Sequence, residues 1–276
     1  MPSTDARTSP GPLSGRSVVV TGASRRRGIG FAIAHRLAAL GADVAVQHWR
    51  PHDAAQPWGA DDLDAVLAGL RAALAPGARL VDVDLDLAAA DAGERLIAEA
   101  GAALGHLDVL VCNHARSGGD GTLAAVDAAM LDAHWQVNTR STLLATRAFA
   151  AQHDGRPGGR VVWTTSGQQL GPMPDEVAYA ASKAALAGVT ASVADWLVER
   201  GILLNTVNPG PVNTGYLDVE TADRPPEVLD AVLRHFPGGR FGEPDDPARL
   251  VAWLVSDEGR WMVGQVLSTE GGFRRW

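Results

Sequence analysis

The stretch SVVVTGASRRRGIGFAIAHRLAAL, residues 17 to 40, decides the fold of this chain. Its first part, Val18 to Val20, is a β-branched run suited to a strand that is buried on both faces. From Ile29 to Leu40, apolar residues instead recur at the spacing of one helix face. The stretch therefore predicts a strand, a turn and a helix, in that order.

The turn between strand and helix carries Gly22, Gly28 and Gly30. Glycine lets the backbone turn tightly, lets a phosphate approach and lets the helix pack closely on the strand. The helix that follows points free N–H groups, and the positive end of its dipole, at an anion bound there. Because the turn also begins a series of alternating strand and helix patterns, we expect it to bind a dinucleotide.

Length and composition indicate a globular protein with a large core. The chain has 276 residues, of which 46% are hydrophobic and 20% are charged. Its formal charge of −8 argues against a nucleic-acid-binding surface, which needs a basic face. The single cysteine, Cys112, excludes an internal disulfide and agrees with a reducing compartment.

The N-terminal segment carries no targeting pattern. Residues 1–15 have no apolar centre, and no stretch of the chain approaches the roughly 18 consecutive apolar residues of a membrane span. We expect residues 1–15 to be a disordered tail and the protein to be cytoplasmic.

Strand and helix patterns alternate along the rest of the chain. Expected strands are 43–47, 79–83, 107–112, 160–165, 202–207 and 264–268, and expected helices are 63–74, 88–104, 127–151, 177–200, 228–235 and 247–256, with a loop at 48–60. Such alternation predicts an α/β fold with right-handed crossovers. We expect one Rossmann-type doubly wound domain over residues 16–276, with a seven-stranded, mainly parallel sheet, helices on both faces and a substrate loop at about 208–240.

Tyr179 and Lys183 lie four residues apart at the start of an expected helix, so both project from one face. An ammonium group near a phenol stabilises the phenolate and brings the tyrosine pKa down toward neutral pH. Ser166 ends the expected fifth strand, at the carboxyl edge where parallel sheets bind ligands. A Tyr-x3-Lys pair by itself is common on helix surfaces, so the wider pattern decides its meaning.

Together with the glycine turn, Asn138 and the segment NPGPVNT (208–214), these residues resemble the short-chain dehydrogenase/reductase family over about residues 15–272. Ser166 lies 13 residues before Tyr179, and Asn138 lies in the helix before the serine strand, as in that family. Within the family, the chain looks most like the 3-oxoacyl-[acyl-carrier-protein] reductases.

The resemblance implies a catalytic tetrad of Asn138, Ser166, Tyr179 and Lys183. Tyr179 would be the general acid in carbonyl reduction and the base in alcohol oxidation, and Ser166 would donate a hydrogen bond to the carbonyl oxygen. Lys183 would bind the nicotinamide ribose and bias the tyrosine, and Asn138 would hold a water in the proton relay.

The resemblance also implies a set of contacts to the cofactor, running from the adenine to the nicotinamide end. These are Gly22, Ser24, Arg25, Gly28, Ile29, Gly30, His48, Trp49, Arg50, Asp86, Leu87, Asn113, His114, Ala115, Tyr179, Lys183, Pro209, Gly210, Val212 and Thr214.

The glycine turn departs from the family pattern. Five residues, Ala23 to Arg27, separate Gly22 from Gly28 where the family usually has three, a spacing similar to that of the enoyl-reductase branch. That branch places its lysine seven residues after the tyrosine. The spacing of Tyr179 and Lys183 therefore favours the main, ketoreductase-like branch.

The segment after the fourth strand also departs, because the usual Asn-Asn-Ala-Gly is Cys112, Asn113, His114 and Ala115 here. We predict that Cys112 is a small buried residue rather than a reactive thiol. His114 is either a substrate contact or a hydrogen-bonded structural histidine.

No metal site is expected. His48 and His52 are four residues apart, but Pro51 between them interrupts a helix, and no carboxylate or cysteine completes a zinc set.

Charge after the second strand predicts the cofactor. NAD enzymes of this fold place an acid there, which binds the ribose 2′-hydroxyl and repels a 2′-phosphate. His48 occupies this position, and no acid follows until Asp53. The arginines at 25–27 and Arg50 can offer a guanidinium to the 2′-phosphate. We therefore predict NADP (NADPH), with NAD as the alternative.

Three functions fit these features. The leading hypothesis is an NADPH-dependent oxidoreductase that moves a hydride between nicotinamide and a small carbonyl or alcohol, such as a 3-oxoacyl thioester or a general ketone. The alternatives are a catabolic alcohol or sugar dehydrogenase that works oxidatively, and a non-catalytic dinucleotide-binding redox sensor. The family packs the helices at 127–151 and 177–200 against symmetry mates, which implies a homotetramer or a dimer.

Overall fold

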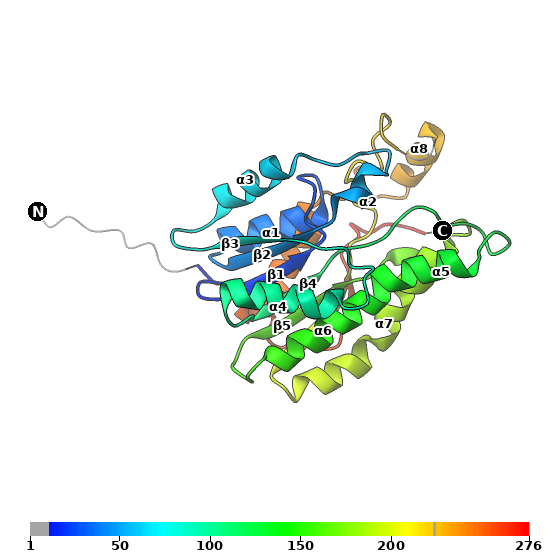
Figure 1. The fold of residues 1–276 in the computed structure, drawn as a ribbon. Helices are drawn as coiled ribbons and strands as arrows, with labels where there is room; N and C mark the ends of the chain where they lie inside the picture. The colour runs from blue at the N-terminus through cyan, green and yellow to red at the C-terminus, as the bar shows by residue number, and fades with distance from the viewer. Residues whose placement is uncertain (1–10, 223–224, 276) are drawn as a thin grey trace, which may run out of the picture.

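A single seven-stranded parallel sheet forms the centre of the molecule in the computed structural model, which describes residues 11–222 and 225–275 (Figure 1). The strands are β1 (Ser17–Thr21), β2 (Asp43–His48), β3 (Leu80–Asp84), β4 (Val109–Cys112), β5 (Gly159–Thr164), β6 (Ile202–Asn208) and β7 (Val266–Ser268). They lie in the order β3-β2-β1-β4-β5-β6-β7, and every pair is parallel. The expected doubly wound sheet is confirmed.

The order of the strands reverses between β1 and β4, where Val18 pairs with Val109. From β1 the chain first builds outward through β2 and β3, and then returns to β4 and builds the other way. Ligands of such sheets bind in the crevice beyond the carboxyl ends of the strands at this reversal.

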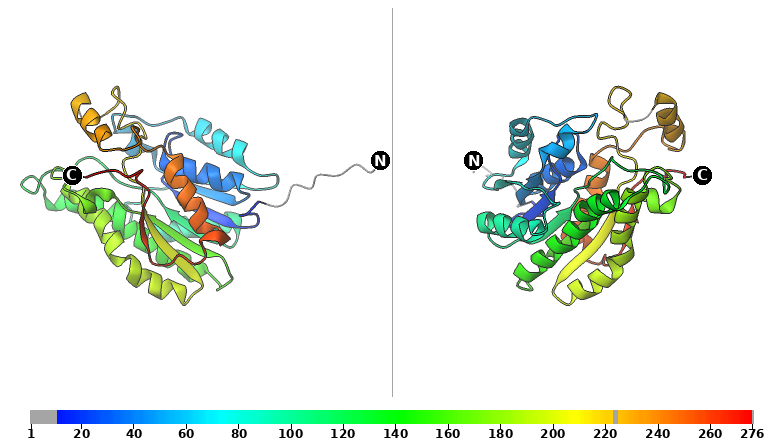
Figure 2. Two further views of the ribbon diagram at one scale, coloured as in Figure 1. Left: turned by 180° about the vertical axis from the view of Figure 1, so that it is seen from behind. Right: turned by 45° about the vertical axis from the view of Figure 1, so that its right-hand side comes forward.

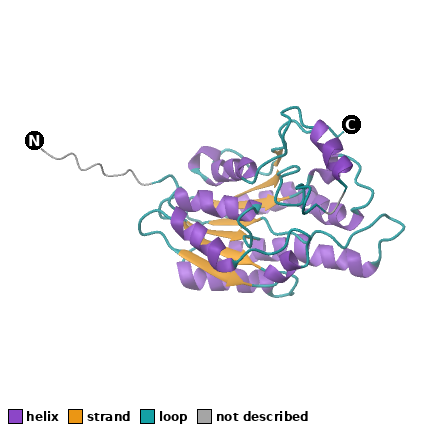
Figure 3. Ribbon diagram, turned by 90° about the horizontal axis from the view of Figure 1, so that it is seen from above, coloured by secondary structure: helices purple, strands orange, loops and turns teal. Residues whose placement is uncertain are grey.

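Helices cover both faces of the sheet (Figures 2 and 3). One face carries α1 (Ile29–Ala39), α3 (Leu63–Ala73) and α9 (Asp245–Val255), and the other carries α4 (Ala92–Leu104), α6 (Ser141–Gln152) and α7 (Val177–Val198). Each set packs on its own apolar cluster, because parallel strands are buried on both sides. Trp163 on β5 and Cys112 on β4 are buried in the second cluster, which confirms the small buried role predicted for Cys112.

A π-helical turn interrupts the long helix that the sequence predicts at 127–151. The chain forms α5 (Ala128–His134), then the wide turn Trp135–Arg140, then α6. Asn138 lies inside this turn and is fully buried. Single π-helical turns in α-helices often mark functional sites.

Two other expectations need correction. A short helix, α2 (Arg50–Ala54), occupies part of the predicted loop at 48–60, because Pro51 lies in its first turn, where no backbone N–H is required. α4 begins at Ala92 rather than 88, after the turn that Asp86 forms by accepting from the N–H of Ala88 at 2.8 Å.

The packed domain begins earlier than residue 16. Leu13 is fully buried, and its N–H donates to the carbonyl of Leu40 at 3.0 Å, so Leu13 anchors residues 11–15 to the domain and they are not a free tail. Residues 1–10, the rest of the predicted tail, lie outside the described residues.

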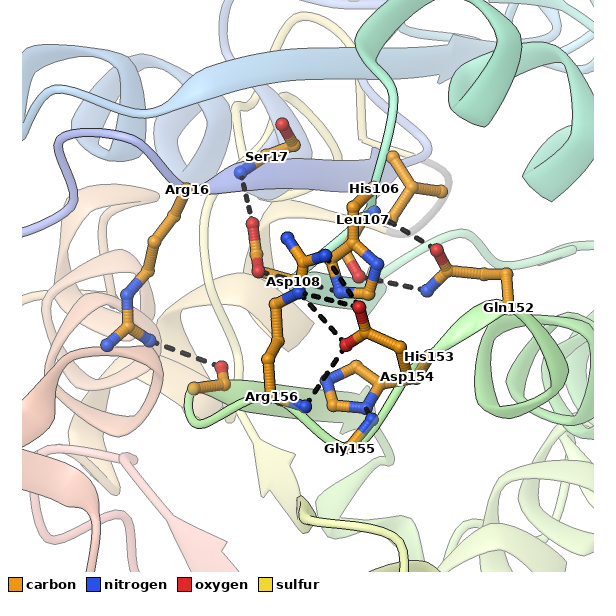
Figure 4. A network of polar contacts seen from close by, with 12 residues as sticks. Arg16, Ser17, His106, Leu107, Asp108, Gln152, His153, Asp154, Gly155 and Arg156 are labelled. Atoms are coloured by element: carbon orange, nitrogen blue, oxygen red, sulfur yellow. Dashed lines mark hydrogen bonds and ion pairs between the residues drawn. The ribbon is translucent and has the colours of Figure 1, made fainter.

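Polar contacts tie the strands together at the edge opposite their carboxyl ends (Figure 4). Asp108, just before β4, accepts from the N–H of Ser17 at 2.9 Å, and Arg16 donates to the carbonyl of Gly158 at 3.2 Å. The side-chain amide of Gln152 accepts from the N–H of Leu107 and donates to the carbonyl of Leu107. This network joins the beginnings of β1, β4 and β5.

α7 is long and apolar enough to cross a membrane by length and composition, with a mean hydropathy of 1.3 in its most apolar window. The sequence predicts no such span, because no stretch approaches roughly 18 consecutive apolar residues. An apolar helix in a protein core meets the same criterion, and α7 packs against β6.

Candidate active site

The glycine turn after β1 lies tightly against the end of β4. Gly22 has a φ of +72°, and a Cβ atom there would lie 2.8 Å from the Cα of His114. A Cβ atom on Gly30 would lie 2.3 Å from the carbonyl oxygen of Gly22. Side chains at these two positions would therefore force the turn away from β4 and α1.

Hydrogen bonds hold β4 and the turn together. Thr21 accepts from the N–H of Asn113 at 3.0 Å, and the Asn113 amide donates to the carbonyl of Thr21 at 3.2 Å. Asn113 thus follows β4 and contacts the turn.

Ser166 and the start of α7 lie at the carboxyl end of β5. The Thr165 hydroxyl donates to the carbonyl of Lys183 at 2.7 Å, which joins the strand end to the first turns of α7. Ser166 is half-buried and caps a short 3₁₀ helix, Gly167–Leu170, by accepting from the N–H of Gln168 at 3.3 Å. Tyr179 is half-buried one turn before Lys183 on α7.

Asn138 joins the π-helical turn to the loop after β4 and to α7. Its Oδ1 accepts from the N–H of Arg116 at 2.7 Å, and its Nδ2 donates to the carbonyl of Arg116 at 3.1 Å. Nδ2 also lies 2.9 Å from the hydroxyl of Ser182, the residue before Lys183. Asn138 therefore clamps the elements that carry the other candidate residues.

Lys183 is buried, and its ammonium group donates to the carbonyl oxygens of Thr164 at 3.1 Å and His114 at 3.3 Å. Burial lowers the pKa of Lys183 to about 8. A buried ammonium group whose partners, among residues 11–222 and 225–275, are backbone carbonyls is a donor suited to the hydroxyl groups of a ribose.

The pKa of Tyr179 differs from the prediction. The sequence predicts that Lys183 lowers it, but burial raises it above its ordinary value, with smaller contributions from Glu176 and Tyr216. The physical reason is that the Lys183 ammonium faces two carbonyls of the sheet edge, while the phenol loses hydration. Tyr179 is therefore protonated at neutral pH, the form of a general acid.

His114 is a structural histidine. Its Nδ1 lies 2.7 Å from the hydroxyl of Thr21, and its Nε2 lies 2.9 Å from the carbonyl of Val137 and 2.7 Å from the hydroxyl of Ser141. Burial, and then the nearby Lys183, lowers the pKa of His114 to about 3, so the ring is neutral. Of the two roles that the sequence left open, the structure supports the structural one.

Each arginine of the expanded turn has a carboxylate partner. Arg25 pairs with Asp53 at 3.1 Å, Arg26 with Asp61 at 3.2 Å and Arg27 with Asp218 at 2.5 Å. The first pair is largely buried, Ser24 also hydrogen-bonds Asp53, and Arg25 donates to the carbonyl of Thr214 at 2.7 Å.

The other residues predicted to contact the cofactor also lie beyond the carboxyl ends of the strands. Arg50 and Trp49 are exposed after β2, whereas the His48 ring is buried and faces Asp82 at 3.3 Å and Asp84 at 3.7 Å. Asp86 and Leu87 follow β3, Ala115 follows His114, and Ile29 begins α1 after Gly28. Pro209, Gly210, Val212 and Thr214 follow β6, with Gly210 at φ +72° beside Glu270.

Two residues near Tyr179 carry no local signal that predicts them. Asp120 in the loop after β4 accepts from the N–H groups of Ala178 and Tyr179, and the buried ring of His134 packs on the Tyr179 ring. The 59 positions between Asp120 and Tyr179 hide the first contact from any local pattern. Within residues 11–222 and 225–275, no group of three or more His, Cys, Asp or Glu side chains is arranged to bind a metal.

Comparison with known proteins shows the family of this chain. Residues 22–274 match the model of a family described as enoyl-(acyl carrier protein) reductase. The chain is 36% identical over 259 residues to the uncharacterized oxidoreductase YjdA of Bacillus subtilis, covering 93% of this chain and 96% of that protein. The chain belongs to the short-chain dehydrogenase/reductase family.

Two more members of the family carry names that bear on cofactor and substrate. A short-chain dehydrogenase from Burkholderia cenocepacia, solved in complex with NADP, is 37% identical, with a TM-score of 0.80 over 95% of this chain and 98% of that one. An NADPH-dependent aldehyde reductase-like protein of Arabidopsis thaliana is 31% identical over 267 residues, which is 96% of each chain. As a member of this family, the chain is an oxidoreductase that binds a nicotinamide cofactor.

Proposed function

We propose that this oxidoreductase is an NADPH-dependent carbonyl reductase, similar to the 3-oxoacyl-thioester and ketone reductases of its family. The observation that carries the proposal is that the end of β5, which Ser166 follows, is bonded to the first turns of α7, which carry Tyr179 and Lys183. Asn138 clamps the elements around them. The NADPH-dependent relative from Arabidopsis supports the direction of reduction.

Each of the four candidate side chains has its own role in the reduction of a bound carbonyl. Ser166 donates a hydrogen bond to the carbonyl oxygen, and Tyr179, protonated at neutral pH, gives that oxygen its proton. Lys183, whose ammonium group lies at the end of β5, would hold the nicotinamide ribose. Asn138 keeps the π-helical turn in place for a water in the proton relay.

The glycine turn, Asn113 and Lys183 fit a dinucleotide, because the turn is free of Cβ atoms where it meets β4 and the buried ammonium donates to two backbone carbonyls. When bound, the cofactor supplies the hydride. The choice of NADPH rests on three features: the exposed Arg50 after β2, a histidine rather than an acid at position 48, and the pairing of Asp53, the next acid along the chain, with Arg25. The Burkholderia complex with NADP supports it.

A panel of ketones, aldehydes, 3-oxoacyl thioesters and alcohols, read at the absorbance of reduced nicotinamide, tests the proposal. We expect reduction of carbonyls with NADPH and slower oxidation of the matching alcohols at neutral pH. NADPH binding without turnover on the whole panel would contradict the proposal and favour a redox sensor. The cytoplasmic location and the homotetramer predicted from the sequence form part of the same proposal.

A further inference from the structure

Residues 270–275, which follow β7, run back past the end of β6 to the end of β5, and we call them the C-terminal strap. Glu270 of the strap accepts from the side-chain amide of Asn208, at the end of β6, at 2.7 Å. Arg275 donates from Nε to the carbonyl of Gly167 at 3.1 Å. Because Gly167 directly follows the candidate catalytic serine, the strap connects the end of β6 with the turn that carries this serine.

Inside the strap, Arg275 and Glu270 form an ion pair whose side chains are only 13% and 9% exposed. Removing one partner from a buried pair leaves the other charge without compensation, so the pair holds the strap in one arrangement. The guanidinium binds Glu270 through one terminal nitrogen and Gly167 through Nε. Charge-assisted hydrogen bonds therefore run without a break from Asn208 to Gly167.

Glycines leave the space that this ion pair fills. A Cβ atom on Gly167 would overlap the guanidinium of Arg275, and one on Gly171 would lie 2.8 Å from the Cδ of Arg275. A Cβ atom on Gly210 would lie 2.8 Å from the Cγ of Glu270. Neither Gly167 nor Gly171 has a positive φ, so the backbone does not require glycine at these two positions. The Arg275 side chain accounts for both.

The strap also contacts α8 (Pro226–Arg234), the helix of the substrate loop, at its C-terminal end. The rings of Phe273 and Phe236 pack with their centroids 4.8 Å apart. The N–H of Arg274 donates to the carbonyl of His235 at 3.0 Å. A displacement of α8 is therefore transmitted through the strap toward the end of β5.

We propose that Arg275 is a positioning residue for Ser166, and that the C-terminal strap joins the Ser166 turn to α8. The Ser166 hydroxyl accepts from the N–H of Gln168 at 3.3 Å, and Gly167, whose carbonyl Arg275 holds, lies between the two residues. Fixing this carbonyl fixes the turn and with it the direction of the hydroxyl. The importance for catalysis rests on the proposed function, whereas the contact between strap and turn does not.

Amide hydrogen exchange of the full chain tests this contact without a substrate. Arg275→Met removes the guanidinium and keeps an unbranched side chain. We expect it to speed the exchange of residues 168–171 by about three- to tenfold, because the turn loses its anchor. Arg274→Met, the same substitution at the neighbouring exposed arginine, is the matched control and should leave the exchange unchanged. Equal exchange in Arg275→Met and wild type would overturn the proposal.

A second variant keeps both charges of the ion pair, which Arg275→Met does not. Gly167→Ala should displace the guanidinium by its methyl group alone and speed the same exchange. In the Arg275→Met background it should add little, because the group that it displaces is already absent. Full additivity of the two changes would overturn the proposal. Wild-type exchange in Gly167→Ala alone would do so too, without need of the arginine variant.

Kinetics test the positioning role. We expect Arg275→Met to lower kcat with NADPH by about tenfold or more and to leave the KM for NADPH unchanged, because the serine moves and the cofactor site does not. Arg275→Lys keeps the charge, but one ammonium group cannot reproduce the two-sided geometry of the guanidinium. It should therefore recover the thermal stability lost in Arg275→Met but not the kcat, and Arg274→Met should retain both.

Failure of this proposal and failure of the proposed function give different results. A wild-type kcat in Arg275→Met, together with faster exchange of residues 168–171, would overturn the positioning role. A wild-type protein without turnover on any carbonyl, in which the exchange results hold, would contradict the proposed function and leave the contact between strap and turn established.

Discussion

Burial sets the protonation states of His114 and Lys183, which lie beside each other where β4 and β5 end. Both side chains are removed from water, so each charged form loses hydration, and their positive charges would repel each other. His114 is neutral as a result and serves as a hydrogen-bonded link between Thr21 and the π-helical turn.

The pKa of His114 predicts a loss of stability in acid. Since burial lowers this pKa from 6.5 to about 3, the unfolded chain binds a proton in this range that the folded chain does not, and stability falls as pH drops below about 6.5. At pH 5 the loss is about 2 kcal/mol. We expect the difference in free energy of unfolding between wild type and His114→Gln, measured in urea, to shrink from pH 7 to pH 5.

The control for this experiment is His35→Gln, which changes an exposed histidine on α1. Its difference from the wild type should stay constant over the same range. A constant difference for His114→Gln as well would show that the buried ring takes up a proton in the folded state.

Replacing Tyr179 by phenylalanine removes one ionisable oxygen and keeps the ring. We expect Tyr179→Phe to lower kcat/KM by more than tenfold, since no proton donor remains, and to leave NADPH affinity nearly unchanged in a fluorescence titration. Retention of more than about a tenth of wild-type kcat/KM, a loss of less than roughly 1.4 kcal/mol, would refute the assignment.

Arg50 is the residue that we expect to determine the preference for NADPH over NADH. It is exposed after β2, and no ion pair to it is found within the described part of the chain. We expect kcat/KM to be about tenfold or more higher with NADPH than with NADH. Arg50→Ala should reduce this ratio, because one charge-assisted contact to the 2′-phosphate contributes about 1.5–3 kcal/mol.

Arg25→Ala should also reduce the preference for NADPH over NADH in kcat/KM, because it leaves the carboxylate of Asp53 free to repel the 2′-phosphate. Arg71→Ala, an exposed position on α3, serves as the control. Equal or better use of NADH by the wild type would show that these arginines do not bind the phosphate.

At the level of elements, the two extra residues of the glycine turn connect it to the substrate loop after β6. Arg25 donates to the carbonyl of Thr214 at 2.7 Å, Arg27 pairs with Asp218 at 2.5 Å, and Asp218 in turn accepts from Asn213 at 2.6 Å. The Trp58 ring lies between Arg25 and Tyr216. These contacts surround a cavity of about 280 Å³ between turn and loop.

Breaking the Arg27–Asp218 pair should loosen this loop. The side chains are 60% and 26% exposed, so the pair is weak, and we expect Arg27→Ala to speed amide hydrogen exchange of residues 213–221 by about two- to threefold. The reversed pair, Arg27→Asp with Asp218→Arg, should restore slow exchange. Arg156→Ala, which breaks an ion pair with Asp154 at the opposite edge (Figure 4), should leave the loop unchanged. Equal exchange in Arg27→Ala and wild type would contradict the connection.

At the scale of the whole molecule, large apolar side chains remain exposed on two faces. Val189, Trp196 and Val198 on α7 are 36%, 45% and 43% exposed, and Trp253 and Trp261 are 41% and 93% exposed near the C-terminal end of α9. Exposed large apolar side chains of this kind are candidates for contacts with partners.

We expect these faces to be covered in a homotetramer, or failing that in a dimer, because closed symmetric assemblies are common among enzymes. Light scattering at micromolar concentration measures the mass. Trp261→Lys and Trp196→Lys should each lower it, whereas Leu123→Lys, at an exposed loop position, should not. A monomeric mass for the wild type would contradict the expectation.

The sequence alone determined the layered fold and the members of the candidate site. The β-branched run at Val18 to Val20, the glycines of the turn and the helical spacing after Ile29 are local properties, so they could be recognised without a structure. The positions of Ser166, Tyr179 and Lys183 follow from strand ends and helix faces, which also repeat over short distances.

Only the tertiary structure decided how those residues are held and charged. The π-helical turn at Asn138, the neutral ring of His114 and the cap that Asp120 places on α7 each depend on partners far away in the chain. Even the arginines of the turn find their carboxylates up to 191 positions away. A pKa depends on burial and on the distance to other charges, and neither quantity exists until the chain has folded.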